Sequence, residues 1–267
     1  MRLGEMTWTQ VREAIEAGVT AVLPLGSVEE HGPHNVVGDY LACDKITAAA
    51  TDQTGDVMAP VMPFGYSEYF RNYPGTITMR APTLAAVVTD AVECLLRHRF
   101  RRIAIFNGHA GNAGVLNLVT RRFRRKREIV IPTLNVLGLT QTPEVVERVY
   151  GRKIGLGHGG EPMGSLMMHV VPGRVQMQRA GEWARREVFG CPTEGLDTIR
   201  VSGIRVSVPL DMEDVTPPTG SLSDPTPATP ERGRQLFEHA VEGCVTFLRW
   251  FRNVDPYLGP VPPSNAP

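Results

Sequence analysis

Short apolar runs alternate with helical stretches along this chain, and that alternation constrains its fold more than any other feature. Residues 19–25 and 103–106 are runs of strand length, and residues 83–100 carry apolar side chains at intervals of three and four. The same criteria predict helices over 7–16, 41–53, 165–170 and 230–251, and strands over 57–62, 128–134 and 204–208. Strands that alternate with helices at this spacing form right-handed βαβ units. We therefore predict an α/β protein with a mostly parallel central sheet.

The composition indicates one large domain without a highly charged partner. The chain has 267 residues, 42% of them apolar, which suffices for one substantial core. Lys and Arg together number 28, as do Asp and Glu, so no net field attracts nucleic acid or an anionic membrane. The basic run 121–127 is expected to be a solvated helix end. We expect one domain over 1–254 and a flexible, Pro-rich tail over 255–267.

Neither a membrane span nor a secretory signal is recognisable in the sequence. No apolar run reaches the length of a bilayer, and the first residues lack a basic and apolar signal pattern. The four cysteines are scattered without a CxxC pair, which is typical of thiols in a reducing compartment. We therefore expect a cytoplasmic protein with no membrane partner.

The most unusual stretch runs from Glu29 to His34 and is followed by Asp39. It places three carboxylates and two imidazoles directly after the apolar run 21–26. Because that run is interpreted as a buried strand, the cluster is expected at the carboxyl edge of the sheet, where ligands bind in open α/β folds. Carboxylate and imidazole are the ligands that Zn²⁺ and Mn²⁺ prefer. The alternative is a solvated loop that is acidic and histidine-rich by chance.

Two further loops present a histidine close to glycines. Residues 107–112 follow the strand predicted over 103–106 and contain His109, so they fall on the same edge of the sheet. Residues 157–161 contain His158 between glycines. One such loop is more often structural than functional, but three in one α/β chain indicate a common site.

This combination of side chains points to metal-assisted hydrolysis. A divalent metal lowers the pKa of a bound water toward neutrality and polarises the carbonyl that is attacked. The natural metal ligands are Glu29, His31, Asp39 and His109. His158 and Glu161 are expected to transfer protons or orient the substrate, while Glu30 supports the ligands. Serine catalysis and nucleotide binding are disfavoured because the sequence has neither a GxSxG elbow nor a P-loop.

The motifs resemble those of the creatininase family, in the same order along nearly the whole chain. Residues 23–34, LPLGSVEEHGPH, are similar to the family's LPxGSxEQHGxH motif, and Tyr73–Thr76 is similar to its FPGT turn. Asn107–His109 matches its NGH motif, and His158–Ser165 resembles its HxGExETS segment. Thr219–Gly233 resembles the C-terminal signature of the family.

This resemblance implies a three-layer α/β/α fold, a binuclear Zn²⁺ or Mn²⁺ site and commonly a hexameric assembly. By motif match, Glu29 and His109 would serve one metal and His31 the other, with Asp39 as the bridging ligand. His158 would act near the leaving group. We accordingly expect a homo-oligomer that takes a small-molecule substrate and holds one or two divalent ions per chain, Zn²⁺ and/or Mn²⁺.

Several positions depart from the family pattern. Asp39 follows the motif histidine by eight residues, one fewer than is usual in the family. Gly111 stands where creatininase carries a glutamate ligand of the second metal, and Met163 replaces the glutamate of the ETS triplet. Glu161 is then the best candidate for the missing carboxylate ligand. Residues 154–157 contain no tryptophan to surround a flat substrate, so creatinine itself is not the expected substrate.

Three functions remain open. The first is metal-dependent hydrolysis of a C–N bond at the carbonyl of a small, polar and cyclic substrate. The second is ring opening of a keto-inositol, such as 3-dehydro-scyllo-inosose, by C–C cleavage. The third is a non-catalytic binding protein that kept the fold, which Gly111 and Met163 favour. The expected substrate-binding residues are His34, Tyr66 and Tyr69.

Overall fold

The computed structural model describes residues 1–259, and a four-stranded parallel sheet lies at their centre. The strands are β1 (Thr20–Leu25), β2 (Val57–Met58), β3 (Arg102–Asn107) and β4 (Thr133–Asn135), in the order β2-β1-β3-β4. β1 pairs with β3 along its whole length, so that Leu25 lies opposite Asn107 at the carboxyl edge. The predicted parallel sheet is confirmed.

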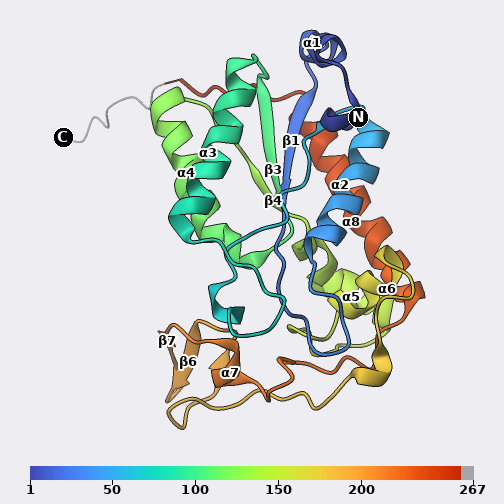
Figure 1. Ribbon diagram of the computed structural model, residues 1–267, viewed down its shortest axis with the longest axis vertical. Helices are drawn as coiled ribbons and strands as arrows, with labels where there is room; N and C mark the ends of the chain where they lie inside the picture. Colours follow the sequence, from blue (N-terminus) through green and yellow to red (C-terminus); the bar gives the residue numbers. More distant parts are fainter. Residues whose placement is uncertain (260–267) are drawn as a thin grey trace, which may run out of the picture.

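Helices cover both faces of this sheet, as Figure 1 shows. One face carries α1 (Trp8–Glu16), α3 (Ala81–Arg97) and α4 (Ala113–Arg127), and the other carries α2 (Tyr40–Thr54), α5 (Pro143–Tyr150), α6 (Met163–Val170) and α8 (Pro230–Phe251). Successive residues of β1 point to opposite layers, so Val22 joins the core under α2 and α8 while Leu23 joins the core under α3 and α4. The fold is a three-layer α/β/α fold.

Local sequence signals explain where several helices begin and end. The side chains of Thr7 and Gln10 form a capping box at the start of α1. Thr229 caps α8 and Pro230 occupies its first position, so the predicted bounds 230–251 are confirmed. α2 ends at Thr54 and is followed by Gly55, whose φ of 71° suits glycine. No helix within residues 1–259 combines the length and the apolar character needed to cross a bilayer.

A second, antiparallel sheet follows α6 in the chain. It consists of β5 (Thr193–Glu194), β6 (Thr198–Val201) and β7 (Ile204–Ser207), and the short helix α7 (Met212–Val215) comes after it. Of this region only the strand at 204–208 had been predicted. Figure 1 shows this sheet at the lower end of the molecule, beyond the central sheet. Its core residues Ile199, Leu210 and Met212 pack with Phe70, which ties it to the candidate site.

The strand predicted over 128–134 is largely wrong, since only Thr133–Asn135 pairs with β3. Residues 128–130 instead hydrogen-bond to residues 256–258, with the Val130 amide donating to the Pro256 carbonyl at 2.9 Å. The first residues of the expected tail therefore lie along this segment. Residues 260–267 of that tail are outside the described part of the chain.

The order of the strands creates a crevice at the carboxyl edge of the sheet. β1 leads to α2 on one face, whereas its neighbour β3 leads to α4 on the opposite face. Connections that diverge from adjacent parallel strands leave a crevice between them, which is where ligands bind in such folds. The loop that carries Glu29 and the loop that carries His109 both begin there.

Candidate metal centre

The loops that follow β1 and β3 approach each other through glycines. A Cβ atom at Gly108 would lie 2.5 Å from the Cβ of Cys43, and one at Gly26 would lie 2.3 Å from the Cα of Tyr40. Only glycine permits such close packing against α2. This packing brings the β1 and β3 loops together, and the structure places Glu29, Asp39 and His109 side by side there.

Glu29, Asp39 and His109 form the first of two groups. All three are buried, and His109 Nδ1 lies 3.0 Å from Glu29 Oε2 and 3.1 Å from Asp39 Oδ2. The other ring nitrogen, Nε2, lies 2.9 Å from the carbonyl oxygen of Tyr66. Burial lowers the pKa of His109, but the two carboxylates outweigh burial and raise that pKa well above its usual value. Burial and Glu29 raise the pKa of Asp39 to about 6.

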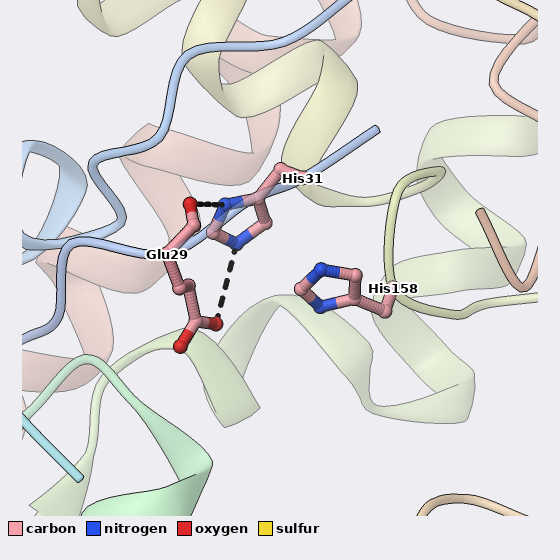
Figure 2. Close-up of side chains that lie close together, drawn as sticks. All are labelled: Glu29, His31 and His158. Carbon is pink, nitrogen blue, oxygen red and sulfur yellow. Dashed lines mark hydrogen bonds and ion pairs between the residues drawn. The ribbon is translucent and has the colours of Figure 1, made fainter. Parts of the chain in front are cut away.

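Glu29, His31 and His158 form the second group, drawn in Figure 2. His31 Nδ1 lies 3.1 Å from the carbonyl oxygen of Glu29, and His31 Nε2 lies 3.7 Å from Glu29 Oε1. His158 Nε2 lies 2.6 Å from the carbonyl oxygen of Glu30 and 2.9 Å from its Oε1. The two imidazole rings are stacked, with centroids 4.7 Å apart. Glu29 is the residue that the two groups share.

Each of the three histidines has one ring nitrogen fixed by a backbone carbonyl. A carbonyl oxygen can only accept, so the contacting nitrogen of His31, His109 and His158 is the donor. The second nitrogen of His31 and of His109 then faces the Glu29 carboxylate, at 3.7 and 3.0 Å. A histidine held in this way, with one N–H given to a carbonyl, is typical of metal ligands.

The buried carboxylates of the site have no Lys or Arg partner within residues 1–259. The ion pairs of Glu29, Glu30 and Asp39 are all with histidines. Uncompensated buried charge is strongly unfavourable, so such a cluster calls for cations. The ligand atoms of each group lie within 4.8 Å of one another. This donor set of nitrogen and carboxylate oxygen fits Zn²⁺ or Mn²⁺.

Two serines that had not been predicted hold the carboxylates in place. The Ser67 hydroxyl donates to Glu29 Oε2 at 2.6 Å, and the backbone amide of Ser27 donates to Asp39 Oδ1. The hydroxyls of Ser27 and Ser67 also contact each other. Ser27 lies in the same sequence motif as Glu29, so its place in the motif could have indicated a role at the site. Ser67 comes from a separate loop, and nothing in its sequence context marks it.

Glu161 belongs to neither group. Its Oε1 accepts a hydrogen bond from the Ser165 hydroxyl at 2.6 Å, and its Oε2 accepts one from the Tyr150 hydroxyl at 2.9 Å. Burial raises the pKa of this carboxyl. Glu161 borders the cavity, yet both of its oxygens are engaged in joining α5 to α6. The geometry therefore gives no support to Glu161 as the replacement ligand.

Gly111, which lacks the expected carboxylate, also has no room for one. A Cβ atom there would lie 2.2 Å from the Tyr69 hydroxyl and 2.3 Å from the Tyr66 carbonyl oxygen. The tyrosine hydroxyl thus stands in the space that a side chain at position 111 would need.

A cavity of about 990 Å³ opens above the two groups. Both Tyr66 and Tyr69 line it, as expected for substrate-binding residues, together with Glu29, His109 and His158. Leu196 and Leu210 of the second-sheet region close its far side. His34 is buried but is not among the lining residues, so the structure places it away from the substrate space. A volume of this size admits ligands up to drug size.

Known proteins are similar to this chain over nearly its whole length. Creatinine amidohydrolase of Pseudomonas putida is 26% identical over 263 residues, spanning 92% of this chain and 95% of that protein. Mycofactocin precursor peptide peptidase of Mycobacterium ulcerans is 25% identical over 270 residues, spanning 96% and 95%.

Solved structures of creatininases share the fold. A crystal structure of creatinine amidohydrolase superposes with a TM-score of 0.78 at 25% identity, covering 95% of this chain and 98% of that one. A manganese form of creatininase gives the same TM-score and identity, and covers 95% and 99%. The chain also matches the family described as creatinine amidohydrolase over residues 4–248. It therefore belongs to the creatininase family of hydrolases.

Proposed function

We propose that this protein is a metal-dependent hydrolase that cleaves a C–N bond at a carbonyl. The observation that carries the proposal is the pair of ligand groups sharing Glu29 at the base of a cavity. Relatives named as an amidohydrolase and a peptidase support cleavage of amide-type bonds. We expect a small-molecule substrate, because the cavity can hold ligands up to the size of a drug.

The group of Glu29, Asp39 and His109 would hold the more tightly bound ion. It offers two carboxylates and one imidazole, all buried, whereas the group of Glu29, His31 and His158 offers only the shared carboxylate and two imidazoles. Because Glu29 belongs to both groups, we assign Glu29, instead of Asp39, as the ligand that two ions would share. Zn²⁺ and Mn²⁺ both suit these ligands, and creatininase structures of a manganese form and of a Zn-Zn type are known. A bound divalent ion supplies Lewis-acid chemistry, because it polarises a carbonyl and makes a water molecule more acidic.

His158 is assigned to proton transfer when only the tighter site is filled. Its Nε2 is fixed by Glu30, and its ring is stacked between His31 and Phe70, with centroids 4.7 and 4.3 Å away. The ring therefore has one orientation, with Nδ1 as its free nitrogen at the cavity. A positioned imidazole that accepts a proton from the nucleophile can return it to the leaving nitrogen.

Metal analysis of matched variants tests the proposal. After dialysis, Glu29→Gln and His109→Ala should retain far less Zn²⁺ than the unchanged protein and should lose hydrolysis of a panel of cyclic amides and peptide amides. Glu68→Gln and His98→Ala are the controls, because Glu68 lines the cavity outside both groups and His98 is exposed. Full zinc content and activity in Glu29→Gln and His109→Ala would refute the proposal.

A ring-opening reaction on a keto-inositol is the second candidate. A hydrolase of Thermotoga maritima named for 3-dehydro-scyllo-inosose is 24% identical over 133 residues, spanning 49% of this chain and 42% of that protein. No tryptophan lines the cavity within residues 1–259, which favours a substrate other than the flat ring of creatinine. Incubation with a diketo-inositol, followed for an acidic ring-opened product, decides between the two reactions.

A non-catalytic binding protein is the outcome to infer if the site holds no metal. The closed space at Gly111 favours this alternative, because it removes one possible ligand position. A zinc content near zero, together with no turnover of amides or ketones, would support it.

A further inference from the structure

The hydroxyl of Tyr69 occupies a defined position in the wall of the cavity. The residue lies in the short helix Glu68–Phe70, and its oxygen stands 2.2 Å from where a Cβ of Gly111 would be. Its ring makes edge contacts with Phe70, at a centroid distance of 4.7 Å, and with Tyr66, at 6.4 Å. These contacts fix the ring. Because Gly111 has no side chain, there is room beside it for the Tyr69 hydroxyl.

This hydroxyl is a donor without a partner inside the described part of the chain. Tyr69 is half-buried and lies near the carboxylates of Glu29 and Asp39. Its hydroxyl makes no hydrogen bond within residues 1–259. A phenol keeps its proton at neutral pH, so the O–H remains available to donate. Tyr69 lines the cavity together with both ligand groups. A fixed donor beside the reacting position is what stabilises developing negative charge on a carbonyl oxygen.

We propose that the Tyr69 hydroxyl is a catalytic hydrogen-bond donor to the carbonyl oxygen of the substrate, an inference that rests on the proposed hydrolytic function. Water adds to the carbonyl carbon and passes one proton to His158, while the π electron pair moves onto the carbonyl oxygen. That oxygen, now negative, accepts the hydrogen bond from Tyr69. When the C–N bond breaks, the electron pair restores the C=O bond and the leaving nitrogen takes the proton from His158. An acid and an amine result.

Tyr69→Phe removes the hydroxyl and keeps the ring contacts. The matched control is Tyr257→Phe, which removes a hydroxyl from an exposed tyrosine that does not line the cavity. Inorganic phosphate serves as the probe, because it is a tetrahedral oxyanion, and its binding to the zinc-loaded protein is measured by calorimetry. Tyr69→Phe should weaken phosphate binding by about 10-fold or more, while Tyr257→Phe should change it by less than about 3-fold. For any amide that the panel identifies, kcat should fall about 100-fold in Tyr69→Phe with little change in KM.

Zinc content and melting temperature separate this role from a structural one. Both should be unchanged in Tyr69→Phe, because the ring still fills its place. Phosphate binding equal to that of the unchanged protein would overturn the proposal, as would zinc-loaded protein that binds no phosphate at all. Loss of zinc in Tyr69→Phe would also overturn it, since Tyr69 would then act on the metal site. An unchanged protein that binds no zinc would instead refute the hydrolase proposal itself.

Discussion

His158 lies face to face with His31, with ring centroids 4.7 Å apart and planes inclined by 20°. Phe70 stacks on the other face of His158 at 4.3 Å. Three segments that are distant in the sequence therefore meet at one ring. This arrangement makes the orientation of His158 depend on packing from both sides.

Replacing Phe70 tests that dependence. Phe70 is buried in the core of the second sheet, so Phe70→Ala should lower the free energy of unfolding by about 3–5 kcal/mol. It should also reduce turnover, because one of the two rings that stack on His158 and hold its orientation is removed. Phe189→Ala is the control, since Phe189 is 84% exposed and its removal should cost little. Urea unfolding measures both variants, and equal stability of the two would contradict the packing argument.

Glu30 anchors His158 through its side chain as well as its backbone. Its Oε1 lies 2.9 Å from His158 Nε2, and its Oε2 accepts a hydrogen bond from the Gly32 amide at 2.7 Å. Glu30→Ala should therefore destabilise the protein by about 1–3 kcal/mol, because the Gly32 amide loses its acceptor and His158 loses its carboxylate partner. Glu30→Gln keeps one acceptor oxygen and should stay close to the unchanged protein. Similar losses in both variants, in urea unfolding, would show that the charge and not the acceptor matters.

Gly111 should not tolerate a side chain. Gly111→Ala places a methyl group against the Tyr69 hydroxyl and the Tyr66 carbonyl, and should cost about 1–3 kcal/mol of stability. Gly114→Ala is a close control, because a Cβ there meets nothing within 4 Å and the residue lies in α4. That change should leave stability within about 1 kcal/mol or increase it. Thermal unfolding of the two variants compares them, and an unaffected Gly111→Ala would show that Tyr69 moves easily.

The parallel sheet was predictable from sequence because its central strands β1 and β3 contain continuous apolar runs, Ala21–Leu25 and Ile103–Phe106. β1 and β3 are buried almost completely, and the helices beside them carry regular apolar faces. Of the second sheet only β7 was predictable, because Ile204–Ser207 alternates between apolar and polar residues, whereas β5 is two residues long and too short to show a period. The pairing of residues 128–130 with 256–258 joins distant segments, which a local pattern does not reveal.

Sequence motifs predicted most of the residues that meet at the candidate site, but not the contacts between them. Motif spacing brought Glu29, Asp39 and His109 to one edge of the sheet. Which carboxylate belongs to both groups depends on side-chain direction, and in the structure that carboxylate is Glu29. The hydrogen bonds of Glu161 with Tyr150 of α5 and Ser165 of α6 likewise depend on the tertiary structure.

Removal of metal should reverse the way in which stability depends on pH. In the metal-free protein the pKa of His109 is raised well above 6.5, so the folded state binds a proton that the unfolded state gives up. This contribution is complete below pH 6.5 and is lost as the pH rises toward the folded-state pKa. The free energy of unfolding of chelator-treated protein should fall above pH 6.5, by up to about 1.4 kcal/mol per pH unit.

With Zn²⁺ or Mn²⁺ in excess the same pH range should show no such fall. Ligation requires a neutral imidazole and an ionised carboxylate, so rising pH favours binding, and ion at 100 times its Kd adds about 2.7 kcal/mol to stability. His109→Gln should abolish the fall in the metal-free protein, because the titrating ring is gone, whereas His98→Ala, at an exposed histidine, should preserve it. Urea unfolding at pH 6.5, 7.5 and 8.5, with chelator and with metal, gives the two curves. Parallel curves would mean that His109 neither titrates as described nor binds the ion.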